Sequence, residues 1–243
     1  MSLRSALLLA ILVFVATLLV RLPASVLMPL LPAGIGCEMP GGTLWQGSCA
    51  RLRYGSLSLS GFSWKLHPAA LLRLRVSAEL SSEDPRARGH TQVELTRDGG
   101  IHLQALSAQL PLQGGLRLFP QGLAGTLQIA VQDARLRHDQ LLALQGSIRV
   151  LQLRSEDEPA DLGNFELQFP AAAGTGPIEG QLHDLGGPLS VSGQLRLLRG
   201  GGYDLSGWVA ARPQASPDLI QALQLLGPPD AQGRRMFSLA GSL

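Results

Sequence analysis

Aromatic residues and lysine are scarce in this sequence. Phe, Trp and Tyr make up 5% of its 243 residues, and Lys65 is the only lysine. Basic and acidic residues number 20 and 18, and setting aside Arg4 and Arg21, which flank an N-terminal apolar run, leaves 20 − 2 = 18 of each sign. A neutral body lacks the basic stripe with which nucleic-acid-binding proteins neutralise phosphates. We therefore exclude nucleic acid as a partner.

The sequence signatures of metal sites and common catalytic centres are also missing. The chain has no Cys-x-x-Cys or His-x-x-x-His spacing, and its five histidines lie in separate strand or turn contexts. No Gly-x-Ser-x-Gly stretch occurs where a strand leads into a helix. The densest acidic cluster, residues 156–158, lacks the spaced oxygen donors of a calcium loop and is interpreted as a solvated turn. We predict no enzyme activity and no catalytic, cofactor-binding or metal-binding residues.

The N-terminal apolar run determines the expected compartment. Residues 5–20, SALLLAILVFVATLLV, carry no charge, and as a helix they extend roughly 24 Å at ~1.5 Å per residue, against the ~30 Å of a bilayer core. Arg21 can snorkel, and Leu22 extends the run. A cleaved signal peptide is the alternative, but no small-x-small site follows directly. We favour an uncleaved, single-pass signal-anchor over residues 1–22, followed by a Pro-rich juxtamembrane segment over residues 23–36.

Export changes the expected state of the two cysteines, Cys37 and Cys49. In an oxidising compartment thiols tend to pair, and these two form the only possible pair. Redox-active pairs usually sit two residues apart at a helix start, whereas this pair brackets the turn-rich sequence EMPGGTLWQGS. We predict a structural disulfide that ties a turn near the membrane.

Most of the remaining chain alternates apolar and polar residues with a period of two, which is typical of half-buried strands. In residues 71–80, LLRLRVSAEL, the pattern places Leu72, Leu74 and Val76 on one face with Ala78 and Leu80. Residues 93–105 indicate a hairpin with a glycine-rich turn. Strands that follow one another with few intervening helices favour an antiparallel meander.

Three places depart from this alternation. The segment SPDLIQALQLLG predicts a short helix, with Ser216 as N-cap and Pro217 at the first helical position. Residues 136–146, LRHDQLLALQG, are interpreted as a second helix. Around Gly61 the apolar phase slips from Leu57 and Leu59 to Phe62 and Trp64, which predicts a bulge or bend.

The three tryptophans, Trp45, Trp64 and Trp208, each sit within or beside an alternating stretch. Core packing is the expected role of such large side chains, and interface contact is the alternative. Trp45 and Trp64 are retained as candidate partner contacts.

Several motifs, in order, carry a family resemblance. They are RLPA after the apolar run, GGTLWQG, FSWKLHPAALL, and QLLGPPDAQGR before a closing strand. In this arrangement the chain resembles the type II secretion system protein N family. The resemblance implies a bitopic inner-membrane component of the machine that exports folded proteins, with inner-membrane platform proteins and the outer-membrane secretin as partners and no catalytic residues. The chain also resembles the AsmA-related envelope proteins, whose half-pipe sheets present an apolar groove.

The expected fold is therefore mainly β: a curved, twisted antiparallel sheet of the AsmA-like half-pipe type, with one or two short helices, preceded by an N-terminal transmembrane helix. Residues 37–243 are expected to form a periplasmic β domain. The expected function is that of a non-enzymatic, inner-membrane-anchored secretion component. A periplasmic lipid-binding or lipid-shuttling groove protein is the alternative, motivated by the apolar strand faces.

Overall fold

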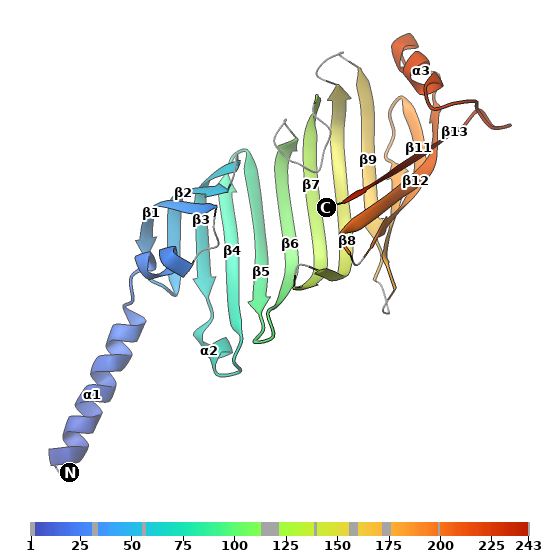
Figure 1. Cartoon of the computed structure of the whole chain (residues 1–243). Helices are drawn as coiled ribbons and strands as arrows, with labels where there is room; N and C mark the ends of the chain where they lie inside the picture. Colours follow the sequence, from blue (N-terminus) through green and yellow to red (C-terminus); the bar gives the residue numbers. More distant parts are fainter. Residues whose placement is uncertain are drawn as a thin grey trace. The chain divides into compact units, whose positions relative to one another are not determined.

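The strands of this chain follow one another across an open sheet in the order of the sequence. The computed structural model describes residues 3–30, 34–54, 57–112, 122–138, 140–155, 160–171, 176–198 and 200–242. Within these ranges, 13 strands form one antiparallel sheet from β1 to β13 (Figure 1). The predicted mainly β, antiparallel fold is confirmed. The acidic cluster at residues 156–158 lies outside the described residues.

The chain divides into two compact units, Met1–Pro85 and Arg86–Leu243. The elements of unit 1 are α1 (Leu3–Val20), the 3-10 helix η1 (Ala24–Leu30), β1 (Ile35–Gly42), β2 (Gln46–Tyr54), β3 (Leu57–Leu66), α2 (Pro68–Leu71) and β4 (Val76–Asp84). Among the described residues, no helix combines the length and apolar content of a membrane span. The sequence-predicted transmembrane helix is therefore not shown by the structure.

A residue with a left-handed backbone explains why the alternation of apolar and polar residues shifts by one position within β3. Gly61 has a left-handed backbone, with φ of 63°, so alternation reverses there and the apolar residues before and after it share one face. Leu52, which pairs with Leu59, and Cys49, which pairs with Phe62, accordingly belong to the same core cluster. The predicted bend is present at Gly61.

The strand predicted over residues 71–80 is wrong in its first half. Pro68 begins the short helix α2, and β4 begins only at Val76. Leu72 and Leu74 are consequently exposed, at 89% and 58%, in place of the inward position that the alternation indicates. Leu80, in the second half, packs on the core of unit 1 as predicted.

Unit 2 contains nine strands and one helix in its described residues. They are β5 (Ala87–Leu95), β6 (Gly100–Leu112), β7 (Leu123–Arg137), β8 (Gln140–Ser155), β9 (Asp161–Phe169), β10 (Ile178–Asp184), β11 (Leu189–Leu197), β12 (Gly202–Ala211), α3 (Pro217–Gln224) and β13 (Arg235–Ser242). Their direction turns progressively from β5 to β13, the twist expected of a sheet (Figure 1). The predicted 93–105 hairpin is β5 and β6. The helix predicted over residues 136–146 is wrong, because that segment contains the end of β7 and the first part of β8.

One hydrophobic core cluster of unit 2 lies where α3 packs on the sheet. Leu219 of α3 packs with Leu189, Val191 and Val209 from β11 and β12. Ser216 caps α3 by accepting a hydrogen bond from the amide of Leu219, as the sequence predicts. This cap fixes the N-terminal end of α3, the helix whose Leu219 packs on the cluster.

Glycines let two strands of unit 2 approach an aromatic ring on β13. Gly193 and Gly207 face each other on β11 and β12, and Phe237 of β13 pairs with Gly207. A Cβ at Gly207 would lie 2.3 Å from the carbonyl oxygen of Ser192 and 2.8 Å from the Phe237 ring. A side chain at this position therefore requires the neighbouring backbone and the Phe237 ring to shift.

Candidate functional site

The turn between β1 and β2 holds the C-terminal end of α1. The indole Nε1 of Trp45 donates a hydrogen bond of 2.8 Å to the carbonyl oxygen of Leu19 in the last turn of α1. The amide of Leu44 donates to the carbonyl oxygen of Leu22 at 2.7 Å, and Pro23 bridges to Thr43. The last carbonyls of a helix have no partner within it, so this turn caps α1. We call these contacts the helix–sheet junction.

Two glycines of the GGTLWQG segment are required by the geometry of this turn. Gly42 has φ of 85°, in the left-handed region that favours glycine. A Cβ at Gly47 would lie 2.4 Å from the Trp64 ring and 2.7 Å from the carbonyl oxygen of Gly41. The GGTLWQG segment therefore forms a tight turn, packs closely against Trp64, and places the Trp45 indole where it bonds to α1.

Trp64 lies on β3, opposite Gly47 of β2, in the core of unit 1. Its side chain is buried among Ala24 and Cys49, and its Nε1 donates to the carbonyl oxygen of Leu44 at 3.1 Å. Trp45 is half-buried and engaged with α1. Both candidate contact residues thus have partners within unit 1, and contact of either with another protein stays a prediction.

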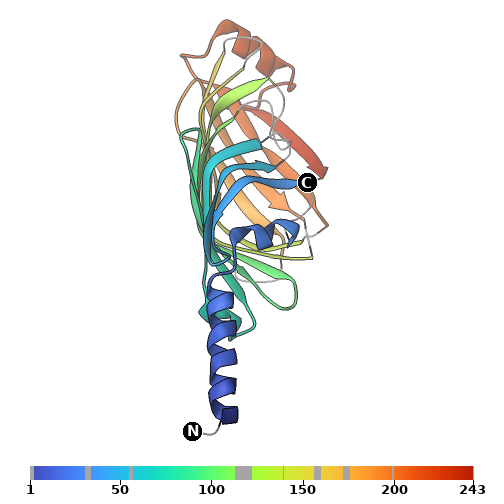
Figure 2. The same cartoon turned by 90° about the vertical axis from the view of Figure 1, so that its left-hand side faces the viewer.

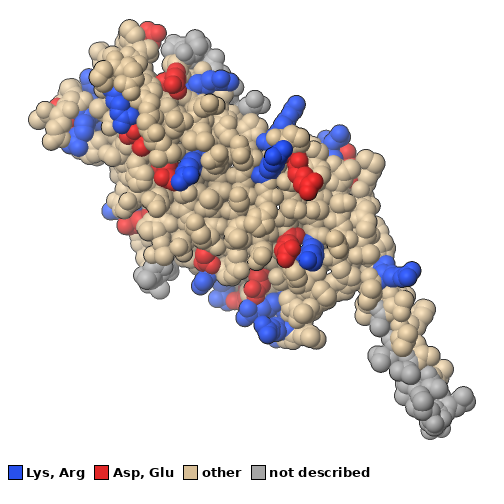
Figure 3. Space-filling model, turned by 180° about the vertical axis from the view of Figure 1, so that it is seen from behind, with Lys and Arg blue, Asp and Glu red and all other residues tan. Residues whose placement is uncertain are grey.

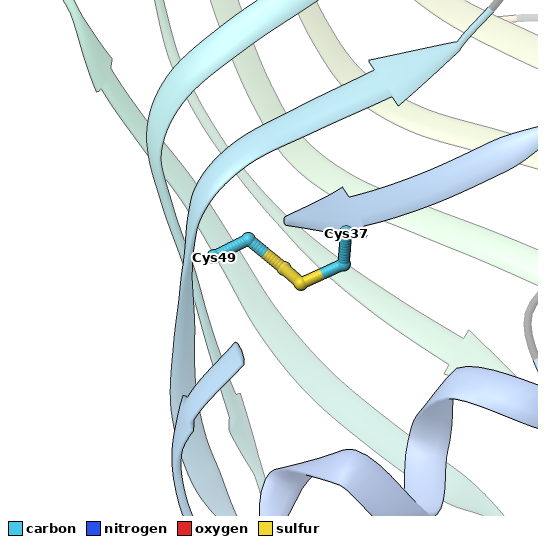
Figure 4. Close-up of a disulfide and its surroundings, with 2 residues drawn as sticks. All are labelled: Cys37 and Cys49. Atoms are coloured by element: carbon cyan, nitrogen blue, oxygen red, sulfur yellow. A yellow bond between two sulfur atoms is a disulfide. The ribbon is translucent and has the colours of Figure 1, made fainter. Parts of the chain in front are cut away.

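The disulfide joins β1 to β2 beside this core. Cys37 and Cys49 lie on neighbouring antiparallel strands with their Cα atoms 5.6 Å apart (Figure 4). Cys49 is buried against Trp64 and Ala24. The sequence-predicted disulfide is confirmed, and its place beside the core makes it part of the scaffold that holds the helix–sheet junction.

Charged side chains are paired across neighbouring strands. In unit 1, Glu38 accepts from Arg51 at 3.2 Å and from Arg53 at 3.0 Å, on an exposed surface. On the face shown in Figure 3, blue and red side chains lie next to one another among uncharged residues. Such exposed pairs contribute little to stability, on the order of 0–1 kcal/mol each.

Asp184 is the centre of the most enclosed polar network described in unit 2. Its carboxylate accepts from the amides of Gly186 and Val191 and from Arg212, the last at 2.6 Å. Burial alone raises the pKa of Asp184, but the hydrogen bonds from Val191, Arg212 and Gly186 outweigh it and lower the pKa below its ordinary value. The network ties the β10–β11 turn to the end of β12.

Two histidines, His67 and His102, are paired with acidic side chains. His67 Nε2 lies 2.9 Å from Glu79 on β4, and His102 of β6 is paired with Asp133 of β7. Arg135 joins the second pair, at 3.2 Å from Asp133. Across the described ranges, no group of three or more His, Cys, Asp or Glu side chains is arranged to hold a metal ion.

Comparison with known proteins gives the family. The family model described as type II secretion system (T2SS), protein N matches residues 33–238. The chain belongs to this family. The matched range of this T2SS protein N family member includes the GGTLWQG turn, the disulfide and the Trp64 core, and extends into β13.

Three curated relatives carry the name type II secretion system protein N. The chain is 28% identical to the protein of Vibrio cholerae serotype O1, over 95% of both chains. It is 30% identical to that of Aeromonas hydrophila over 91% of both, and 25% identical to that of Pectobacterium carotovorum over 88% of this chain and 86% of the relative. No solved structure matches the chain significantly.

Sequence reasoning missed the role of Trp45 as a cap for α1 and the exposed segment between β3 and β4. The Trp45 contact joins residues 26 positions apart, which no local pattern reveals. The exposed segment has the same alternation as a strand, and only Pro68 signals that the strand stops before it.

Proposed function

We propose that this chain is a non-enzymatic component of the type II secretion system, anchored in the bacterial inner membrane with its sheet in the periplasm. The observation that carries the proposal is the family match over residues 33–238, together with relatives named as protein N of this system. The helix–sheet junction and the disulfide support a scaffold role, because they are built from backbone hydrogen bonds and packing around a covalent tie.

The anchoring part of the proposal is supported by the surface of α1. Its described apolar side chains are exposed, among them Leu7 at 63%, Phe14 at 67% and Val20 at 65%. The 18-residue helix extends about 27 Å, short of the ~30 Å bilayer core, so the proposed anchor also needs Arg21 and Leu22, which follow α1. Trp45, bonded to the end of α1, would then lie at the interface, where tryptophan is enriched.

The proposed partners are the inner-membrane platform proteins and the outer-membrane secretin. β1 and β13 are the first and last strands in the order of the sheet, and strand addition to such an edge strand is a common mode of protein recognition. Met39 on β1 and Met236 on β13 are 76% and 58% exposed. They are therefore suitable positions for a photo-reactive amino acid that leaves Trp45 in place.

Photo-crosslinking in the native envelope tests the proposal. The amino acid is placed at Met39 or at Met236, and at Leu198, a 52%-exposed turn residue, as the control. The proposal is supported if more platform subunits or secretin are recovered crosslinked to position 39 or 236 than to position 198. Recovery of lipid alone at all three positions contradicts it.

A periplasmic lipid-binding groove remains the second candidate. It is favoured by a row of four apolar residues that are paired side by side across β5 to β8. These are Leu95, Ile101, Leu136 and Leu141. Leu95 and Ile101 are about two-fifths exposed, at 42% and 38%. Co-purified lipid measured by mass spectrometry tests this candidate. Loss of that lipid on changing Ile101→Asp supports the groove, and unchanged lipid excludes it.

A further inference from the structure

The segment between β3 and β4, residues 67–75, leaves three leucines exposed; we call it the β3–β4 tip. Leu71, Leu72 and Leu74 are 44%, 89% and 58% exposed. Arg73 lies among them with an exposed side chain, and residues 67–75 include no Asp or Glu. Exposed apolar side chains interleaved with arginine are typical of segments that lie in the interface of a membrane.

The β3–β4 tip holds Leu74 in a conformation that normally requires glycine. The amide of Leu74 donates to Leu71 at 2.9 Å and that of Arg75 donates to Ala70 at 3.2 Å, the hydrogen-bond pattern of a Schellman motif. Leu74 occupies the left-handed position of this motif, with φ of 57°, where a Cβ is unfavourable. Its side chain is mostly exposed, so packing within the chain does not explain why a leucine stands there.

The β3–β4 tip lies next to the end of α1. Trp45, whose indole bonds to Leu19 of α1, accepts through its carbonyl oxygen a hydrogen bond of 2.6 Å from the amide of Leu66. Leu66 is the last residue of β3, directly before the tip. In Figures 1 and 2, α2 projects beyond the strands of unit 1 on the side from which α1 extends. A membrane that surrounds α1 would therefore meet the tip.

We propose that the β3–β4 tip is a second membrane contact, in which Leu71, Leu72 and Leu74 enter the interface and Arg73 binds anionic lipid headgroups. This inference rests on the proposed anchoring of α1. Together, α1 and the tip would hold unit 1 at two points and fix its orientation on the membrane surface. The occupant is an anionic bilayer, because the tip is basic as well as apolar.

Lipid quenching on the full chain tests the proposal. An environment-sensitive fluorescent amino acid is incorporated at position 72 or, as a matched control, at position 225. Leu72 and Leu225 are both 89% exposed, and each stands directly after the last residue of a helix, α2 or α3. Each protein is reconstituted into vesicles of phosphatidylcholine and phosphatidylglycerol with brominated acyl chains, and flotation records anchoring separately.

We expect quenching at position 72 to be at least about twofold that at position 225, and to fall in vesicles of phosphatidylcholine alone. A second substitution, Leu74→Gly, keeps the turn and is expected to reduce quenching at position 72. If the chain floats with the vesicles but quenching at positions 72 and 225 is equal, the tip does not contact the membrane, although the chain is anchored. If quenching at position 72 is the same in both vesicle compositions, the claim that the tip binds an anionic bilayer is wrong. A chain that does not float refutes the anchoring and the tip together.

Discussion

Replacing Asp184 tests the energetics of the C-terminal part of the sheet. Asp184→Ala removes the acceptor of two backbone amides, Gly186 and Val191, and of Arg212. Each half-buried amide left without a partner costs about 1 kcal/mol, and the charge-assisted bond adds roughly 1.5 kcal/mol. Arg212 keeps the carbonyl oxygens of Gly187 and Leu189 as acceptors, so its charge is still solvated by the protein. The expected loss is about 3.5 kcal/mol.

Hydrogen exchange of the Val191 amide measures this loss directly. A loss of about 3.5 kcal/mol accelerates exchange by roughly 300-fold where exchange follows the opening equilibrium. Glu179→Gln is the control, because Glu179 and Arg196 form a 3.6 Å pair in which both side chains are about half exposed, and little change is expected. Equal protection of the Val191 amide in Asp184→Ala and in the unmodified chain would show that the Asp184 network does not stabilise this part of the sheet.

The effect of Asp184 depends on pH in a defined direction. Its pKa is lowered from the ordinary 3.8, so the stabilisation is complete above about pH 3.8 and disappears as the pH falls through the folded-state pKa. Protection of Val191 in the unmodified chain is therefore expected to approach that of Asp184→Asn in acid and to exceed it at neutral pH. A difference that grows on acidification would contradict this sign.

Three further substitutions have defined outcomes. Replacing Cys37 and Cys49 together with serine is expected to lower the free energy of unfolding of unit 1 by about 2–3 kcal/mol in urea denaturation, and an unchanged midpoint would argue against a stabilising disulfide. Gly207→Ala is expected to destabilise unit 2 by about 2 kcal/mol in thermal unfolding, whereas Gly200→Ala, which has open space around it, serves as the silent control. Leu74→Gly is expected to leave stability unchanged or to raise it by up to about 1 kcal/mol, because the left-handed strain is relieved; a clear loss would show that the Leu74 side chain packs in unit 1.

Local patterns account for the fold class and for several individual elements. The period-two alternation predicts the meander, because each strand buries one face regardless of its neighbours. Ser216, Pro217 and the apolar spacing predict α3, because these signals act within one helical turn. The change of apolar phase at Gly61 reveals a left-handed residue because glycine marks it.

Other features depend on contacts that alternation does not encode. Met39, Ala105 and Gln152 also have positive φ within or beside strands, yet none is a glycine, so the sequence offers no marker. The residues of the β3–β4 tip alternate like a strand, but the proline and the helical turn after β3 direct them outward. Trp45 caps α1 through a contact between distant residues, which becomes visible only once the turn is folded.

The central claim, a role in type II secretion, is tested most directly by measuring where an exported protein accumulates when this chain is removed from its own bacterium. We expect the folded exoprotein to remain in the periplasm, and re-expression of the full chain to return it to the medium. Unchanged export of the exoprotein without the chain would contradict the proposed function.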